Sequence, residues 1–212
     1  MAPFDAFARA FSPMPAGQTP GPPFRDPFLQ RTRGYTELAE RFAGVTFDEG
    51  LYRIFDAVAA AKATDLARAV YPGGAERLYP FAMDWLGRMF ALDADRVVDQ
   101  EPQIMLLEIG TGHALEVPYS LVAFHDELLA DDPEPAVAAA AWGEWSERHP
   151  DTVPLPATKC VGYELPLFVG GQDSLDNMEV SDWEVYWVVV GQLKLRTAGL
   201  PEGTPIRDIG TG

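Results

Sequence analysis

The stretch RMFALDADRVVDQEPQIMLLEI, residues 88–109, decides the fold class. Its two runs of large apolar residues, 88–92 and 103–109, have the length and composition of β-strands. Asp93-Ala-Asp95 is rich in turn-forming residues, so we place a turn between 92 and 96. A small antiparallel sheet is the simplest assembly of these strands.

Helical segments are expected before and after these strands in the sequence. Residues 54–70 place apolar side chains at helical spacing, and the pattern ends at Pro72-Gly-Gly74. Other segments expected to be helical are 35–42, 120–130 and 135–149, whereas 161–169 is expected to be extended. The sequence therefore predicts an α+β fold, in which a small antiparallel sheet packs against several helices.

The segment 182–196 suits either a buried strand or a helix, because Val185 to Val190 is uniformly apolar apart from two aromatic residues. Ser181 and Glu184 have the spacing of a capping box, in which each side chain satisfies the other residue's backbone N–H. This favours a helix over 182–196, which Gly199 and Pro201 would end.

The first 33 residues differ from the rest of the chain. They contain seven of the nineteen prolines, and their five phenylalanines follow neither a helical nor an alternating pattern. We therefore expect residues 1–33 to form a disordered Pro-rich arm. Residues 34–199 are expected to form a single domain, and 200–212 a flexible tail.

The composition indicates a globular protein that folds without disulfide bonds. The chain has 212 residues, of which 47% are apolar, and its single cysteine, Cys160, excludes an internal disulfide. No signal peptide and no uninterrupted apolar run of about 18 residues is found, so we expect a cytoplasmic protein.

Acidic residues dominate the second half of the chain. The net charge is −16, yet residues 1–33 carry +2, and from Val98 onward five basic residues face twenty acidic ones. Such a field repels nucleic acid and anionic membranes and attracts a basic partner. The alternative is that the charge only keeps the protein in solution.

One motif suggests an enzyme. Met105-Leu-Leu-Glu-Ile-Gly-Thr-Gly112 resembles the strand and glycine-rich turn with which methyltransferases bind S-adenosylmethionine. The third glycine position is Ala114, however, and Leu115-Glu-Val-Pro118 is a poor start for the helix that this site requires. We therefore expect Gly110-Thr-Gly112 to be a hairpin turn, with a small-molecule site at Glu108–Gly112 as the alternative.

Other residues with reactive or metal-binding side chains give weak signals. No metal site or cofactor is expected from the three histidines, which are widely spaced and expected at the surface, or from Cys160, which is expected in the core. Asp173, Asp176 and Asn177 lack the glutamate that closes a calcium loop, which favours a solvated turn. The tryptophans are expected mostly in the core: Trp85, Trp142, Trp145, Trp183 and Trp187.

Four stretches carry a family resemblance. They are GLYRIF (50–55), YPFAMDWLGRMFALD (79–93), CVGYELPLFVGG (160–171) and DNMEVSDWEVYW (176–187). In this order they resemble the GAD-like and Tdi-type immunity proteins of type VI secretion systems, which are similar to the wider SUKH superfamily. The resemblance spans about residues 35–196, with a GAD-like part in 34–75 and a Tdi-like part in 76–199. The Pro-rich arm and Ala82, where such sequences are expected to have glycine, depart from the pattern.

This resemblance implies an α+β protein without catalytic residues that binds and blocks a cognate toxin. Tdi-type proteins are paired with toxins that degrade DNA, which implies a basic DNase as the partner. Carboxylates near Gly170-Gly171, with one aromatic anchor, are then the candidate partner-binding residues: Asp173, Asp176, Glu179, Asp182, Trp183 and Glu184.

Overall fold

The computed structural model describes residues 2–14, 19–74 and 76–199. Within these ranges, seven strands form one antiparallel sheet in which every strand pairs with its neighbours in sequence order. They are β1 (Pro13–Met14), β2 (Thr46–Phe47), β3 (Tyr52–Ile54), β4 (Leu78–Asp84), β5 (Met89–Val98), β6 (Glu101–Glu108) and β7 (His113–Ser120). A separate pair consists of β8 (Lys159–Tyr163) and β9 (Met178–Asp182).

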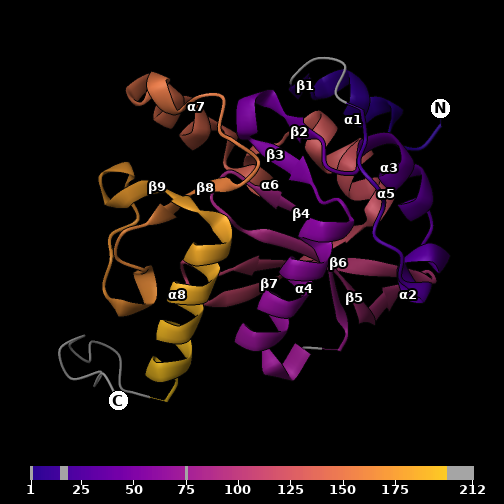
Figure 1. Cartoon of the computed structure of the whole chain (residues 1–212). Coiled ribbons are helices and arrows are strands. Elements are labelled where there is room, and N and C mark those ends of the chain that lie inside the picture. Colours follow the sequence, from indigo (N-terminus) through magenta and orange to yellow (C-terminus); the bar gives the residue numbers. More distant parts are fainter. Residues whose placement is uncertain (1, 15–18, 75, 200–212) are drawn as a thin grey trace.

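Helices surround the sheet (Figure 1). The α-helices are α1 (Asp5–Ala10), α2 (Pro27–Arg31), α3 (Tyr35–Phe42), α4 (Ala57–Val70), α5 (Leu121–Ala123), α6 (Glu134–Val137), α7 (Ala139–Arg148) and α8 (Trp183–Thr197). A π-helical segment, η3 (Phe124–Leu129), continues α5. The 3-10 turns are η1 (Asp48–Gly50), η2 (Pro72–Gly74), η4 (Pro150–Thr152), η5 (Leu167–Val169) and η6 (Leu175–Asn177).

The alternation of side chains along β5 divides the core into two halves. Phe90 and Leu92 pack into the half that contains α1, α3 and η3. Met89 and Ala91 point to the opposite face and pack with α4 and α8. Because successive residues of a strand face opposite sides, a run that is apolar throughout belongs in a sheet covered on both faces. The expected α+β class with an antiparallel sheet is therefore confirmed.

The expected turn at 93–95 is wrong. β5 continues to Val98, and the chain reverses at Asp99 and Gln100, whose φ angles of 51° and 67° are those of a tight two-residue hairpin loop. Asp93 is fully buried, and its Oδ1 lies 3.5 Å from Nε of Arg77. The ion pair explains why a residue typical of turns sits inside a strand.

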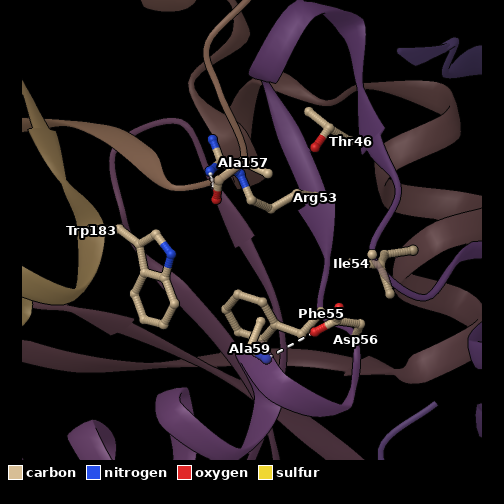
Figure 2. A pocket seen from close by; sticks show the side chains of 9 residues that line it. Thr46, Arg53, Ile54, Phe55, Asp56, Ala59, Ala157 and Trp183 are labelled. Atoms are coloured by element: carbon tan, nitrogen blue, oxygen red, sulfur yellow. Dashed lines mark hydrogen bonds between the residues drawn. The ribbon is translucent and has the colours of Figure 1, made fainter. Parts of the chain in front are cut away.

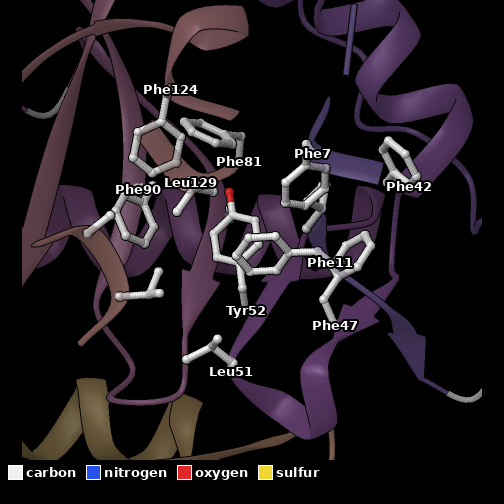
Figure 3. Close-up of a cluster of buried hydrophobic side chains, with 14 of the residues drawn as sticks. Phe7, Phe11, Phe42, Phe47, Leu51, Tyr52, Phe81, Phe90, Phe124 and Leu129 are labelled. Carbon is white, nitrogen blue, oxygen red and sulfur yellow. The ribbon is translucent and has the colours of Figure 1, made fainter. Parts of the chain in front are cut away.

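The N-terminal residues are part of the core, so the expectation of a disordered arm is wrong for 2–14 and 19–33. Phe4 and Phe7 are fully buried, and the ring centroid of Phe7 lies 4.9 Å from that of Phe47 (Figure 3). One carboxylate of η3, that of Asp126, accepts backbone N–H groups of Phe4 at 2.6 Å and of Ala6 and Phe7 at 3.1 Å. α1 and α2 are too short to show a period, so their burial depends on contacts that the local pattern does not reveal.

Most expected helices are present with shifted limits. α4 begins at Ala57, where the Asp56 side chain accepts from the N–H groups of Val58 and Ala59. The helix expected over 135–149 is divided into α6 and α7 by Ala138, whose φ is 50°. The extended segment expected over 161–169 holds strand structure only as far as Tyr163.

The helix expected over 182–196 is α8, but the capping box is wrong. Asp182 caps it, accepting from N–H of Glu184 at 3.1 Å and of Val185 at 3.2 Å. The Glu184 carboxylate instead accepts from Nζ of Lys62 at 2.6 Å. The aspartate lies one residue closer to the helix than Ser181 and makes the cap bonds itself.

Residues 2–33, where described, share one core with 34–199, and β3, within residues 34–75, pairs directly with β4, within residues 76–199. The expected tail, 200–212, lies outside the described residues. None of the described helices has the length and apolarity that crossing a membrane requires.

Candidate functional site

An acidic groove lies between α7 and the turn around η6. It has a volume of about 370 Å³ and is lined by Ala141, Glu144, Arg148, Asp173, Ser174, Leu175, Asp176 and Met178. Two of the six candidate partner-binding residues, Asp173 and Asp176, are therefore brought together here. We refer to this site as the α7–η6 groove.

Folding of α7 places the groove's first wall. Trp142 and Trp145 are buried and lie close to Trp85, with ring centroids 5.4 and 6.5 Å away. Since these two residues face the core, Glu144 and Arg148, one helical turn apart, face outward. All five tryptophans are buried, which confirms the expectation that they belong mostly to the core.

The second wall is a turn held by one amide side chain. Oδ1 of Asn177 accepts from N–H of Leu165 at 3.0 Å, and its Nδ2 donates to the carbonyls of Leu165 at 2.9 Å and Gln172 at 2.8 Å. A Cβ on Gly171 would lie 1.8 Å from the Leu165 carbonyl oxygen, so only glycine fits there. Asn177 thus has a structural role, and the described residues contain no group of three side chains placed to hold a metal ion.

The carboxylates of the groove outnumber its cations. Arg148 forms ion pairs with Glu144 and, at 3.4 Å, with Asp176, whose side chain is 92% exposed. Asp173 accepts from the Tyr163 hydroxyl at 2.6 Å. Burial and this hydrogen bond raise the Tyr163 pKa, so the phenol stays protonated and donates to the carboxylate.

The sequence segments that form the groove contain very few basic residues. Arg148 is the only Lys or Arg between Arg96 and Lys159, and none occurs between Lys159 and Lys194. Exposed acids on α7 and in the segments that flank it add to the field: Glu134, Glu147 and Asp151. The groove therefore lies in a strongly negative part of the surface.

The other four candidate residues lie outside the groove. Glu179 is exposed on β9, Asp182 caps α8, and Glu184 pairs with Lys62. Trp183 is only 4% exposed and stacks on Phe55 with ring centroids 5.9 Å apart, so it is not an exposed anchor. Glu144 and Arg148 were missed, although the outward positions of a helix whose tryptophans face inward signal them.

Trp183 instead forms a wall of a second, smaller pocket of about 100 Å³ (Figure 2). Arg53 of β3 also lines it and donates from Nη1 to the carbonyls of Pro156 at 3.2 Å and of Ala157 and Lys159 at 2.7 Å. Burial lowers the Arg53 pKa to about 10, which leaves it charged at neutral pH. Its contacts identify Arg53 as a clamp for the loop that enters β8.

The glycine-rich motif at 108–112 is not a cofactor turn. It joins antiparallel strands β6 and β7, as the hairpin interpretation predicted, whereas the methyltransferase site requires a helix after the strand. Glu108 accepts from the Thr111 hydroxyl at 2.9 Å and pairs with Arg88 at 3.5 Å. A Cβ on Gly110 would lie 2.5 Å from the Tyr163 ring, so aromatic side chains fill the space.

Two further expectations concern reactive side chains. Cys160 is buried and free, as expected, and burial raises its thiol pKa to about 12. His113 and His149 are exposed, also as expected, but His125 is fully buried. The surface position expected for His125 is therefore wrong.

No family model and no curated protein matches this chain. Among solved structures, it is similar to the crystal structure of Atu4351 from Agrobacterium tumefaciens, with a TM-score of 0.57 and 12% sequence identity. The similarity covers 89% of this chain and 88% of that one. At this identity the similarity shows a shared fold alone.

Proposed function

We propose that this protein is an immunity protein that binds and neutralises a cognate secreted toxin, a basic DNase of a type VI secretion system, in the cytoplasm of the producing cell. The observation that carries the proposal is the α7–η6 groove, where Glu144, Asp173 and Asp176 face solvent with Arg148 as the one cation among the lining residues. The four sequence stretches that resemble immunity proteins support it. The proposal assigns no catalytic residue, membrane contact or direct nucleic-acid contact.

The physical reason is charge complementarity. A nuclease needs a basic surface to hold the phosphates of its substrate, and a carboxylate cluster can occupy that surface in their place. Opposite fields also steer the two proteins together, so association is fast at low ionic strength and slows as salt is added. The groove walls are held by the packing of Trp142 and Trp145 on one side and by the hydrogen bonds of Asn177 on the other, so binding orders little additional structure.

Co-expression tests the function directly. Bacteria that express the cognate toxin, sought among the genes that flank this one, should survive when this protein is co-expressed. Continued killing, with the protein present at normal levels, would contradict the immunity function.

A matched pair of variants tests the groove. The triple variant Glu144→Gln, Asp173→Asn, Asp176→Asn should slow association with the toxin by roughly ten-fold or more and flatten its salt dependence. The control triple variant Glu37→Gln, Glu40→Gln, Glu76→Gln removes the same charge from exposed positions elsewhere. Equal effects of the two variants would mean that total charge, and not the groove, determines binding.

A further inference from the structure

The outward face of α8 is unusually apolar. Val185, Val188, Val189 and Leu195 are 56%, 44%, 59% and 46% exposed, and they lie at helical spacing on one side. A helix at a protein surface normally presents polar residues there. We refer to these four residues with Gln192, also exposed, as the α8 face.

The inward side of the same helix is already fully used. Trp187 is buried, and its Nε1 donates to the carbonyl of Gly87 at 2.7 Å. Gly191 packs against Val70 of α4, where a Cβ would lie 2.5 Å from a methyl group. α8 therefore carries apolar residues on both sides but is covered on one side only, within the part of the chain that the structure describes. Such a face calls for an interaction partner.

The charges at the two ends of α8 indicate which partner. Glu184 lies at the N-terminal end and Arg196 at the C-terminal end, and no acidic residue lies between them. The middle of this face offers no carboxylate to a basic toxin, and its C-terminal end carries a cation that would repel one. A second copy in antiparallel orientation brings each Glu184, which also pairs with Lys62 of its own chain, to the Arg196 end of its partner, and it opposes the two helix dipoles.

The spacing of the α8 face fits this orientation. Reversal about residue 190 places Val185 opposite Leu195 and Val188 opposite Gln192, with Val189 next to the axis. We propose that two copies of this protein associate through antiparallel α8 helices. The proposal does not depend on the immunity function. The α8 face itself contains no acidic residue, which limits the repulsion between two acidic copies at this contact.

The dimer should be weak. Fifteen helical residues span about 22 Å, which buries less area than a standard protein interface. We therefore expect a dissociation constant on the order of 10 µM or higher. At such affinity the monomer and dimer coexist in solution.

Sedimentation equilibrium of the full chain, from roughly 1 to roughly 500 µM, tests the proposal. The unmodified protein should show a monomer–dimer equilibrium, and Val189→Glu should weaken it by at least about ten-fold because it places two carboxylates across the symmetry axis. The control is Val97→Glu, at a valine of β5 with 52% exposure. Purely monomeric protein, or equal effects of both variants, would overturn the proposal.

Cross-linking with a short bis-maleimide tests the orientation. A mixture of Val185→Cys and Leu195→Cys proteins should yield a cross-linked dimer that contains one copy of each variant. Neither variant alone should form a cross-linked dimer. The unmodified protein is the control, since its one thiol is buried. Self-cross-linking of Val185→Cys would indicate parallel helices. If the unmodified protein is monomeric and Val189→Glu abolishes toxin binding, this face belongs to the toxin. Parallel helices or a toxin-binding face would each overturn the proposal.

Discussion

The hydroxyl of Tyr52 donates a hydrogen bond to Nε2 of His125 over 3.1 Å, and both residues are buried. Nδ1 of the same ring lies 2.8 Å from the carbonyl oxygen of Leu121, which can only accept. The proton of the neutral imidazole therefore sits on Nδ1, and Nε2 accepts from Tyr52. Aromatic rings surround the pair: Phe4, Phe7, Phe81 and Phe124.

This site predicts a loss of stability in mild acid. Burial lowers the His125 pKa to about 4, although the Leu121 carbonyl and Asp126 act in the opposite direction. Between about pH 6.5, the ordinary histidine pKa, and pH 4 the unfolded chain binds the proton and the folded protein does not. The contribution of neutral His125 to the free energy of unfolding is thus fully present above pH 6.5. It is lost as the pH falls, by up to roughly 3 kcal/mol at pH 4.

Urea unfolding at pH 7 and pH 5 measures this loss. His125→Gln cannot titrate, so it should be less stable at pH 7 but lose less free energy of unfolding on acidification. Carboxylates that titrate in the same pH range affect both proteins equally. The difference between the two proteins in the change of unfolding free energy therefore measures the effect of His125 alone. An identical pH dependence in both would show that His125 does not carry the effect.

Removal of the Phe7 ring should destabilise the whole domain. Its ring contacts those of Phe11, Phe42 and Phe47, so Phe7→Ala leaves a cavity and should cost about 3–5 kcal/mol. Gln30→Ala, at an exposed position of the same N-terminal segment, should change stability by less than about 0.5 kcal/mol. Thermal unfolding followed by circular dichroism measures both. Little effect of Phe7→Ala would restore the arm interpretation.

The same substitution at two glycines should have opposite effects. Gly110→Ala forces a Cβ against the Tyr163 ring and should destabilise the protein by about 1–3 kcal/mol. Gly143→Ala, in α7 with open space around it, should stabilise by about 0.5–1 kcal/mol because alanine favours the helix. Denaturant titration compares the two, and a neutral Gly110→Ala would show that the Tyr163 packing is loose.

Cys160 should be unreactive in the folded protein. Its thiol is buried, and burial raises its pKa to about 12, so almost no thiolate is present at pH 8. A colorimetric disulfide reagent should modify it only at the rate of unfolding and rapidly in urea. Fast modification without denaturant would indicate that the β8 region opens readily.

Sequence patterns predicted elements that depend on local chemistry and missed those that depend on distant contacts. The strand 103–109 and the helices 54–70 and 182–196 were predicted because each has a run of apolar residues with a recognisable end. Burial of Phe4 depends on residues more than a hundred positions away, including the Asp126 carboxylate.

The α7–η6 groove could be predicted only in part. Asp173 and Asp176 stood out as a carboxylate cluster next to turn-forming glycines. Their proximity to Glu144 and Arg148 depends on how α7 docks, and that is decided by the contacts of Trp142 and Trp145 with Trp85. A pattern of inward tryptophans indicates which residues point outward but not which loop they meet.

The sheet grows strand by strand in sequence order, whereas its α4 face is closed by α8, whose residues are synthesised last among those described. A nascent chain on the ribosome can therefore assemble the whole meander and still expose Met89, Met105 and Leu107 until α8 emerges. During this interval the chain exposes apolar surface that other nascent chains and chaperones can bind. Docking of α8 then removes this apolar face of the sheet from contact with other chains.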